Sequence, residues 1–284
     1  MPPVSSIRPS PIAGTWYEAN PQLLARQIDT FLGDAPALKD VVALIAPHAG
    51  HRYSGAVAGP AYAAVRGCTP QVVAILAPMH AYHPAPLLTS AHAFYSTPLG
   101  NVSVDTALVD VLNRELVSRL EIGLTPVAND PEHALEIQLP FVLRAIKTEF
   151  TLLPVMLRAQ TRLLARALGE ALAATLKGKN ALLIASSDLS HSYPQAIARR
   201  LDDAMLETLA RFDPDGLFDL EESGRGEACG LGALAAVLWA ARALGGENVH
   251  VLARATSGDV TGDYERVVGY GSAVVCKAQK TSVA

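Results

Sequence analysis

The sequence predicts a single α/β domain in which a mixed, largely parallel sheet carries helices on both faces. Short apolar runs alternate along the whole chain with longer amphipathic or alanine-rich segments, as they do in folds whose parallel strands are joined by helices. The chain has no internal repeat, low-complexity tract or Pro/Ser-rich linker. We therefore expect one domain over residues 1–284, with residues 1–17 as an N-terminal arm packed on it.

Composition excludes several classes of protein. Half of the residues are hydrophobic, 18% are charged and the formal net charge is −4, so a large core is expected and the basic stripe of a nucleic-acid binder is missing. The N-terminus shows no signal-peptide pattern, and the longest apolar run, Ala228–Ala241, is shorter than the roughly 20 residues that span a bilayer. The three cysteines lie too far apart for a disulfide framework. We expect a cytoplasmic protein without membrane or nucleic-acid partners.

Local signals place the elements. Asn20 and Pro21 predict the N-cap and first residue of a helix that ends near Leu32. Apolar runs predict buried strands at 41–46, 72–77 and 180–186. Further strands are expected at 86–90, at 93–104 with a turn at 98–101, and at 151–156, 249–253 and 266–276. Further helices are expected at 56–65, 105–117, 133–146 with Pro140 as a bend or break, 161–176, 194–211, 214–222 and 230–244.

Polar residues follow each of the three apolar strands. These residues are His48 and His51 after the first strand, His80 and His83 after the second, and Asp188 and His191 after the third. The carboxyl ends of parallel strands meet at one edge of a sheet, so one histidine from each of the first two loops can reach a shared ion. The sequence leaves open which histidine of each pair points inward.

Cys229 precedes the most apolar predicted helix. A thiol at a helix N-terminus is shifted towards thiolate, and we expect Cys229 to complete a metal-centred pocket with the strand-end histidines. The alternative is a small core residue among glycines, which is the commoner role of an isolated cysteine. Cys68 and Cys276 fit that alternative.

Three further residues, His133, Asp188 and His191, are candidates for acid/base chemistry. His133 lies in the first turns of a helix that Asp130 is predicted to cap, where it would be neutral and able to act as a base; a solvated first-turn residue is the alternative. Asp188 follows two serines at a strand end, where burial needs a partner such as His191. Asp259 lies in a polar turn of the kind that is mostly structural. The sequence contains neither a Gly-rich phosphate loop nor a Gly-x-Ser-x-Gly elbow.

A set of short motifs resembles the Memo family, whose prokaryotic branch is known as AmmeMemoRadiSam system protein B. The motifs are Ala13-Gly14-x-Trp16-Tyr17, Pro47-His48-Ala49-Gly50, Pro78-x-His80, Glu132-His133-x-x-Glu136-x-x-Leu139-Pro140, Ser186-Ser187-Asp188-x-x-His191 and Cys229-Gly230. Together they cover nearly the whole chain in order. The resemblance implies the fold of class III extradiol dioxygenases, which hold non-haem Fe(II) with two histidines and a glutamate.

The resemblance also implies a site. The metal ligands of Memo-like proteins correspond to His48, His80 and Cys229, and the remaining pocket positions correspond to His133, Asp188 and His191. Of these, His191 is the best match to the acid/base histidine of the dioxygenases. Two imidazoles and a thiolate favour one transition metal, with Fe(II) or copper preferred and zinc possible. His51 stands where the family usually has an aromatic residue, which predicts a fourth ligand or a change in pocket polarity.

The function implied is that of a metal-dependent, dioxygenase-like oxidoreductase acting on a small molecule. Two alternatives remain open: a hydrolase that uses zinc-bound water, and a non-enzymatic module that binds metal or docks proteins. The name of the prokaryotic system implies an AMMECR1-type protein and a radical-SAM enzyme as partners.

Overall fold

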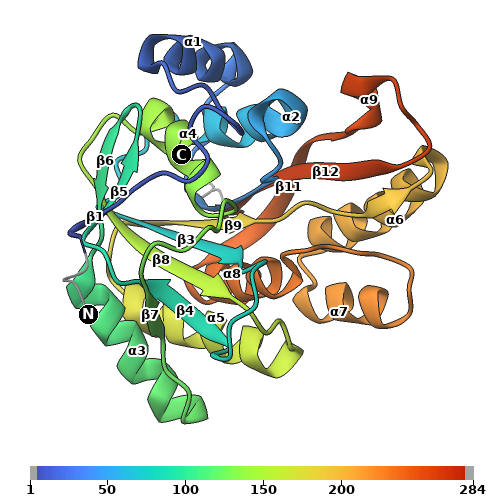
Figure 1. The fold of residues 1–284 in the computed structure, drawn as a ribbon. Helices are drawn as coiled ribbons and strands as arrows, with labels where there is room; N and C mark the ends of the chain where they lie inside the picture. Colours follow the sequence, from blue (N-terminus) through green and yellow to red (C-terminus); the bar gives the residue numbers. More distant parts are fainter. Residues whose placement is uncertain (1–4, 279–284) are drawn as a thin grey trace, which may run out of the picture.

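A computed structural model describes residues 5–278, so residues 1–4 and 279–284 of the predicted domain lie outside the described part. The centre of the fold is four parallel strands (Figure 1). In spatial order they are β2 (Val41–Ala46), β9 (Ala181–Ser186), β3 (Val72–Pro78) and β8 (Thr151–Leu157). Their residues are almost all apolar and buried, as expected of strands covered on both faces. The carboxyl ends of β2, β3 and β9 therefore meet at one edge of the sheet.

Antiparallel strands extend the sheet on both sides, so the predicted mixed sheet is confirmed with its parallel part in the middle. Beyond β2, β12 (Val267–Lys277) pairs with β2, β11 (Gly246–Thr256) and β10 (His191–Tyr193). Beyond β8, β4 (Leu87–Ser90) pairs antiparallel with β8 and parallel with β7 (Thr125–Val127). A separate small sheet contains β1 (Ile7–Arg8), β5 (Phe94–Thr97) and β6 (Gly100–Ser103).

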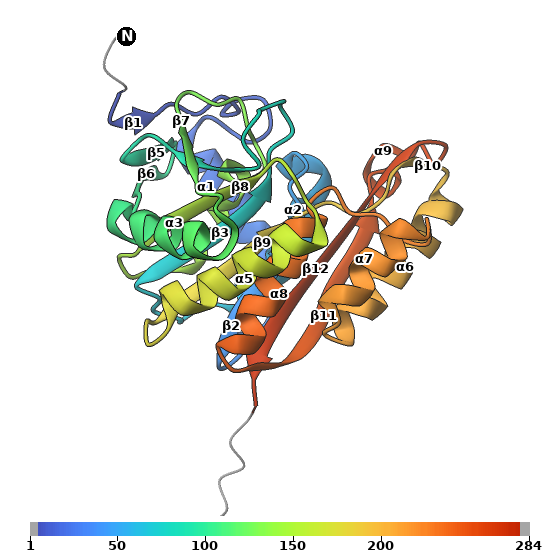
Figure 2. The same ribbon diagram turned by 90° about the horizontal axis from the view of Figure 1, so that it is seen from below.

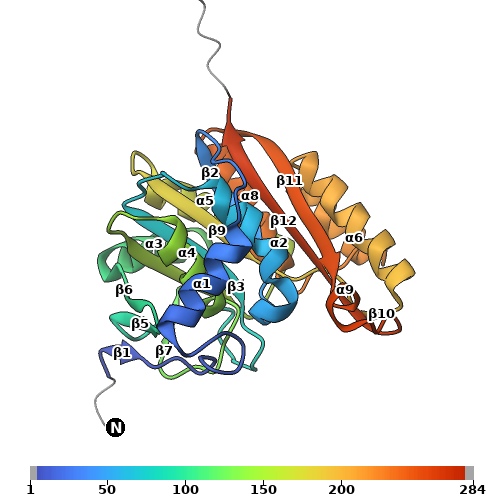
Figure 3. The same ribbon diagram turned by 90° about the horizontal axis from the view of Figure 1, so that it is seen from above.

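Helices cover both faces, as the sequence predicts. One face carries α3 (Thr106–Leu120), α5 (Arg162–Leu176), α6 (Gln195–Ala210), α7 (Pro214–Glu222) and α8 (Leu231–Ala243) (Figure 2). The other carries α1 (Pro21–Leu32), α2 (His51–Ala64) and α4 (Leu139–Ala145) (Figure 3). The short α9 (Gly258–Thr261) lies between β11 and β12 in the chain. Within residues 5–278, no helix combines the length and the hydropathy needed to cross a membrane.

Two helix predictions need correction. Helix α2 begins at His51 rather than Ala56, because the His51 N–H is satisfied by the Trp16 carbonyl of the N-terminal arm (2.9 Å) and needs no side-chain cap. Tight packing holds this helix, since a Cβ at Gly59 would lie 1.9 Å from the Phe31 carbonyl oxygen of α1.

The predicted helix over 133–146 is wrong in its first half. Residues 131–135 are irregular, the 3₁₀ turn η1 covers Glu136–Gln138, and α4 begins only at Leu139. Pro140 lies in the first turn of α4, where its missing N–H costs nothing, so it starts the helix instead of bending it. The Asp130 carboxylate is bonded by Arg8 at 2.8 and 2.9 Å and accepts from the Glu132 N–H (3.1 Å) in this irregular loop, where it caps no helix.

Candidate metal centre

The loops after β2 and β3 and the start of α8 bring His48, His80 and Cys229 together. One ligand atom from each of these residues lies within 4.8 Å of the other two. Cys229 Sγ is 3.1 Å from His48 Nε2, and the two imidazole centroids are 5.3 Å apart at nearly a right angle. The structure thus gathers the three residues that the resemblance implies as ligands, from positions up to 181 residues apart in the chain.

The proton on His48 can be placed from its hydrogen bonds. Tyr62 Oη donates to Gln138 Oε1 (2.7 Å), so Gln138 Nε2 donates to the Pro47 carbonyl (3.0 Å) and to Ser186 Oγ (2.7 Å). Ser186 Oγ gives its own hydrogen to the Ala134 carbonyl (2.6 Å). His48 Nδ1, 3.1 Å from Ser186 Oγ, must therefore be the donor. This leaves the lone pair on Nε2, which faces Cys229.

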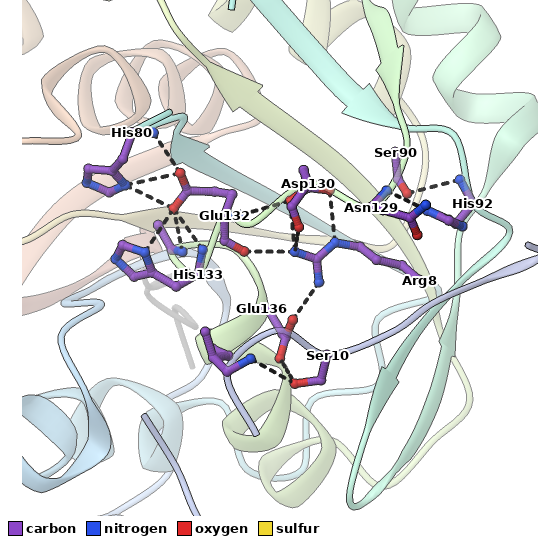
Figure 4. Close-up of polar contacts among 12 residues, drawn as sticks. Arg8, Ser10, His80, Ser90, His92, Asn129, Asp130, Glu132, His133 and Glu136 are labelled. Carbon is purple, nitrogen blue, oxygen red and sulfur yellow. Dashed lines mark hydrogen bonds and ion pairs between the residues drawn. The ribbon is translucent and has the colours of Figure 1, made fainter. Parts of the chain in front are cut away.

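His80 is oriented by Glu132 (Figure 4). The Glu132 carboxylate accepts from His80 Nδ1 at 2.9 and 3.1 Å and from the His80 backbone N–H at 2.6 Å. Burial opposes ionisation of Glu132, but the hydrogen bonds and charge of His80 lower its pKa to about 2, and the same contact raises the pKa of His80. A carboxylate that holds one imidazole nitrogen and leaves the other for a metal is a common outer partner of metal ligands.

Cys229 is placed by its backbone. Its N–H donates to the Asp188 carbonyl (3.3 Å), and its carbonyl accepts from Gln160 Nε2 (2.6 Å). Gly230 allows α8 to start against β9, because a Cβ there would lie 2.5 Å from the Ser186 carbonyl oxygen. Burial, with the nearby Asp188 charge, raises the pKa of the Cys229 thiol well above its usual value. The expectation of a thiolate set by the helix N-terminus is therefore wrong, because burial outweighs the effect of the helix.

The donor set nevertheless fits a metal. Two imidazole nitrogens and one sulfur match the ligands of zinc, copper and iron, and a metal cation itself supplies the charge that favours thiolate. A second group, His80, Glu132 and His133, also lies within 4.8 Å. It fits less well, because the Glu132 carboxylate already accepts from His80 and from the backbone N–H groups of His133 and Ala134.

Comparisons with known proteins decide the family. A family model described as "Memo-like protein" matches residues 8–274. The chain belongs to the Memo-like family. A MEMO1 family protein of Methanopyrus kandleri is 33% identical over 93% of this chain and 96% of its own, and one of Methanothermobacter thermautotrophicus is 34% identical over 93% and 98%.

One solved structure is also similar, the uncharacterized protein JW3007 of Escherichia coli K12. It covers 81% of the Memo-like chain and 99% of its own, with 13% identity and a TM-score of 0.39. A likeness of that degree is too weak to assign a fold. The α/β class of the Memo-like chain therefore rests on its own topology.

The other predicted site residues, His133, Asp188 and His191, have different positions relative to the three ligand candidates. The His133 ring stacks on His80 with the ring centroids 4.7 Å apart, and its centroid lies 4.0 Å from that of the tilted Trp16 ring. Its pKa is lowered to about 4 by burial, with His48 and His80 adding to the effect. His133 is thus neutral as predicted, but the cause is burial in an irregular loop and not a helix N-terminus.

Asp188 and His191 have different places in the Memo-like site. Asp188 Oδ1 accepts from the backbone N–H groups of His48 (2.7 Å) and Ala49 (3.3 Å), and burial raises the pKa of Asp188. It therefore fixes the loop that carries His48. His191 lies at the rim with its side chain 38% exposed, and its Nδ1 donates to the Leu189 carbonyl (2.9 Å).

Three residues whose roles the sequence left undecided have structural contacts. His51 lies among Tyr17, Phe31 and Phe141, donates from Nε2 to the Ile137 carbonyl (3.1 Å), and is in neither group of possible ligands. His83 Nδ1 accepts from the backbone N–H of Ala85 (3.0 Å) in a turn. Asp259 accepts from Thr256, Gln195 and Arg199 at the end of β11.

Sequence reasoning missed the residues that orient the ligands. Glu132 stands in one of the motifs, and Ser186 in another, but neither was given a role. Gln138 and Gln160 were not singled out at all. The only available signal was a polar residue inside an otherwise buried segment, because Glu132 is 52 residues from His80 and Ser186 is 138 residues from His48.

A pocket of about 460 Å³ lies beside the loop that follows His48, and none of the three ligand candidates lines it. Ala49 and Gly50, directly after His48, form part of its lining, and Trp16, whose ring also contacts His133, lines it as well. Tyr53 and Tyr270 add two more aromatic rings, and the described residues that line it are all uncharged. Its volume is within the range of small-molecule sites.

Proposed function

We propose that this Memo-like protein is a metal-dependent, dioxygenase-like oxidoreductase in which His48, His80 and Cys229 hold one transition metal, iron or copper in preference to zinc. One observation carries the proposal: three ligand atoms from separate segments converge within 4.8 Å, and both histidines have their second ring nitrogen already engaged. Such an arrangement orients ligands towards a common point. Three protein ligands also leave coordination positions open.

When bound, a redox-active metal at this point would supply a route for electron transfer from a substrate to O₂. The chain supplies the proton chemistry and the shape. His133 is neutral and next to His80, so it can accept a proton. His191 has its Nδ1 proton committed to Leu189, so a neutral His191 carries its lone pair on Nε2 at the rim. The uncharged pocket beside the loop that follows His48 offers a place for the substrate.

The experiment begins with protein purified without oxygen and analysed for metals, wild type beside Cys229→Ala. Samples reconstituted with Fe(II), Cu(I) or Zn(II) are then assayed for O₂ consumption over a panel of small aromatic and aliphatic compounds. We expect one redox-active metal per chain in the wild type, loss of metal in Cys229→Ala, and loss of turnover with metal retained in His191→Ala. A wild-type protein that binds no transition metal would overturn the proposal.

Hydrolysis is a second candidate because the same donor set suits zinc, and a neutral His133 could accept a proton from a zinc-bound water. Turnover with Zn(II) in the absence of O₂ would favour it over the oxidoreductase. Tight metal binding without turnover on any compound would favour a binding module. In that case, co-purification with an AMMECR1-type protein or a radical-SAM enzyme tests the partners that the resemblance implies.

A further inference from the structure

A buried arginine lies behind the candidate metal centre. Arg8, on β1, is 1% exposed and contacts two buried carboxylates (Figure 4). Its Nε and Nη2 donate to the two oxygens of Asp130 (2.9 and 2.8 Å), and Nη1 donates to Glu136 Oε2 (2.5 Å). Its guanidinium carbon also lies 4.9 Å from the centre of the Tyr95 ring. None of these groups is within the set of possible ligands.

We propose that Arg8 is a positioning residue for the metal centre, acting through Glu132 on His80. The inference rests on the metal site proposed above and adds a residue 72 positions before His80 that sets how well the site binds. Its basis is a continuous series of hydrogen bonds from the guanidinium to the imidazole.

The first step joins Arg8 to the backbone of Glu132. Arg8 Nη2 donates to the Glu132 carbonyl (2.8 Å), and the Glu132 N–H donates to Asp130 Oδ1 (3.1 Å). The Arg8–Asp130 pair therefore fixes Glu132 on both sides of its Cα. Since residues 131–135 form neither helix nor strand, no regular structure would otherwise hold this backbone.

The second step joins Glu132 to His80. The carboxylate accepts from the His80 ring and from the His80 backbone N–H. A shift of the Glu132 backbone would therefore change the direction in which His80 Nε2 points. His80 needs this support more than His48 does, because its side chain is 41% exposed whereas His48 is buried. Outer partners of metal ligands commonly change metal affinity by about 10–100-fold.

A branch of the same network fixes the N-terminal arm. Glu136, fully buried, accepts from Arg8 on one oxygen and from Tyr17 Oη (2.6 Å) and Ser10 Oγ (2.5 Å) on the other. Tyr17 follows Trp16, whose ring contacts that of His133 at a tilt. Arg8 thus ties the loop that carries Glu132 and His133 to the arm that covers them.

The contacts require a guanidinium in particular. Arg8 bonds two carboxylates and the carbonyls of Asp130 and Glu132 at once, and its donors point in fixed directions in one plane. A lysine carries its donors on a single nitrogen and cannot reach both sides of this group. Buried ion pairs often add little net stability, so stability alone is a weak explanation for this one.

The test measures Co(II) affinity of the full-length protein by competition with a chromophoric chelator, together with the thiolate-to-Co(II) absorption that reports Cys229. The variants are Arg8→Lys, Asp130→Asn, Glu132→Gln and the double variant Arg8→Lys/Glu132→Gln. Arg144→Lys is the matched control, because Arg144 also makes a two-bond contact with a carboxylate, that of Asp29, but at the exposed surface.

We expect Arg8→Lys and Glu132→Gln each to weaken Co(II) binding by about 10–100-fold while the thiolate absorption persists at saturating metal. The double variant should lose no more Co(II) affinity than the single variant that binds Co(II) more weakly, since both substitutions act on one path. Wild-type affinity in folded Arg8→Lys, or fully additive losses in the double variant, would overturn the inference. If Arg8→Lys does not fold, Asp130→Asn decides. A wild-type protein without Cys229-dependent Co(II) absorption would instead overturn the proposed metal site.

Discussion

His48 and His51 lie three residues apart on either side of the β2–α2 junction, and both are 2% exposed. Burial lowers the pKa of His48 to about 3 and that of His51 to about 4, so both are neutral at physiological pH. Their surroundings differ in kind. His48 faces Cys229 and His80, whereas His51 lies in an aromatic box made of Tyr17, Phe31 and Phe141.

The comparison shows that neither burial nor a lowered pKa distinguishes a possible metal ligand from a core histidine. The two kinds of histidine differ in which ring nitrogen remains free. In His48 the bond to Ser186 engages Nδ1 and leaves Nε2 towards other ligand atoms. In His51 the bond to Ile137 engages Nε2, and Nδ1 is buried without a partner among the described residues.

The largest expected effect tests the difference between His48 and His51 in metal binding directly. His48→Phe should abolish stoichiometric metal binding, because it removes a proposed ligand, and the loss should exceed the roughly 10–100-fold cost of losing an outer partner. His51→Phe should bind metal like the wild type. Elemental analysis and chelator competition on both variants provide the measurement. Equal losses in the two variants would show that His51 belongs to the site.

A dependence on pH follows from the same ligands. The buried Cys229 thiol has a raised pKa and must lose its proton to bind metal, and His80, whose pKa is raised by Glu132, must do so when it is charged. Metal affinity should therefore weaken at least about tenfold for each unit that pH falls below neutrality. Chelator competition at several pH values tests this, and the weak binding left to the two histidines in Cys229→Ala should show a flatter dependence. An affinity that does not change with pH would contradict the thiol's role.

Ser186→Ala tests the choice of the free nitrogen of His48, because it removes the acceptor for His48 Nδ1–H together with the bonds of Ser186 Oγ to Gln138 and Ala134. The ring would keep its place but lose the acceptor for Nδ1–H, so we expect a loss of about tenfold in metal affinity and about 1–3 kcal/mol in the free energy of unfolding. Ser272→Ala is the control, since that buried hydroxyl has no partner among the described residues. A Ser186→Ala protein that binds metal as tightly as the wild type would show that Ser186 does not determine which nitrogen of His48 is free to bind metal.

Much of the fold follows from local sequence. The runs Val41–Ala46 and Val72–Ala77 are strands because they are apolar throughout, and Asn20 caps α1 with its own side chain, which accepts from the N–H groups of Gln22 and Leu23. These features depend on neighbours within a few residues. Parallel strands then place their carboxyl ends at one edge, which is why the gathering of His48, His80 and Asp188 could be predicted.

The remainder depends on contacts between distant residues. In the irregular loop before η1, Asp130 pairs with Arg8, 122 residues away, and caps no helix. The inward choice of His48 over His51 depends on Ser186 and Ile137, and that of His80 on Glu132. No periodicity or spacing rule encodes such pairs, so the residue pattern alone left both histidine pairs undecided, and only the family resemblance chose His48 and His80.

The smallest expected effect is on the free energy of unfolding and concerns His51. At neutral pH, His51→Phe should change the free energy of unfolding by less than about 1 kcal/mol, because losing the bond to the Ile137 carbonyl is offset by removing an unpaired buried nitrogen. As pH falls from about 6.5 to about 4, an unfolded His51 takes up a proton that the folded one does not. This costs the wild type about 1.4 kcal/mol per pH unit, and His51→Phe should be spared that loss. Urea unfolding at stepped pH measures it, and parallel curves for the two proteins would mean that folded His51 binds a proton as readily as the unfolded residue does.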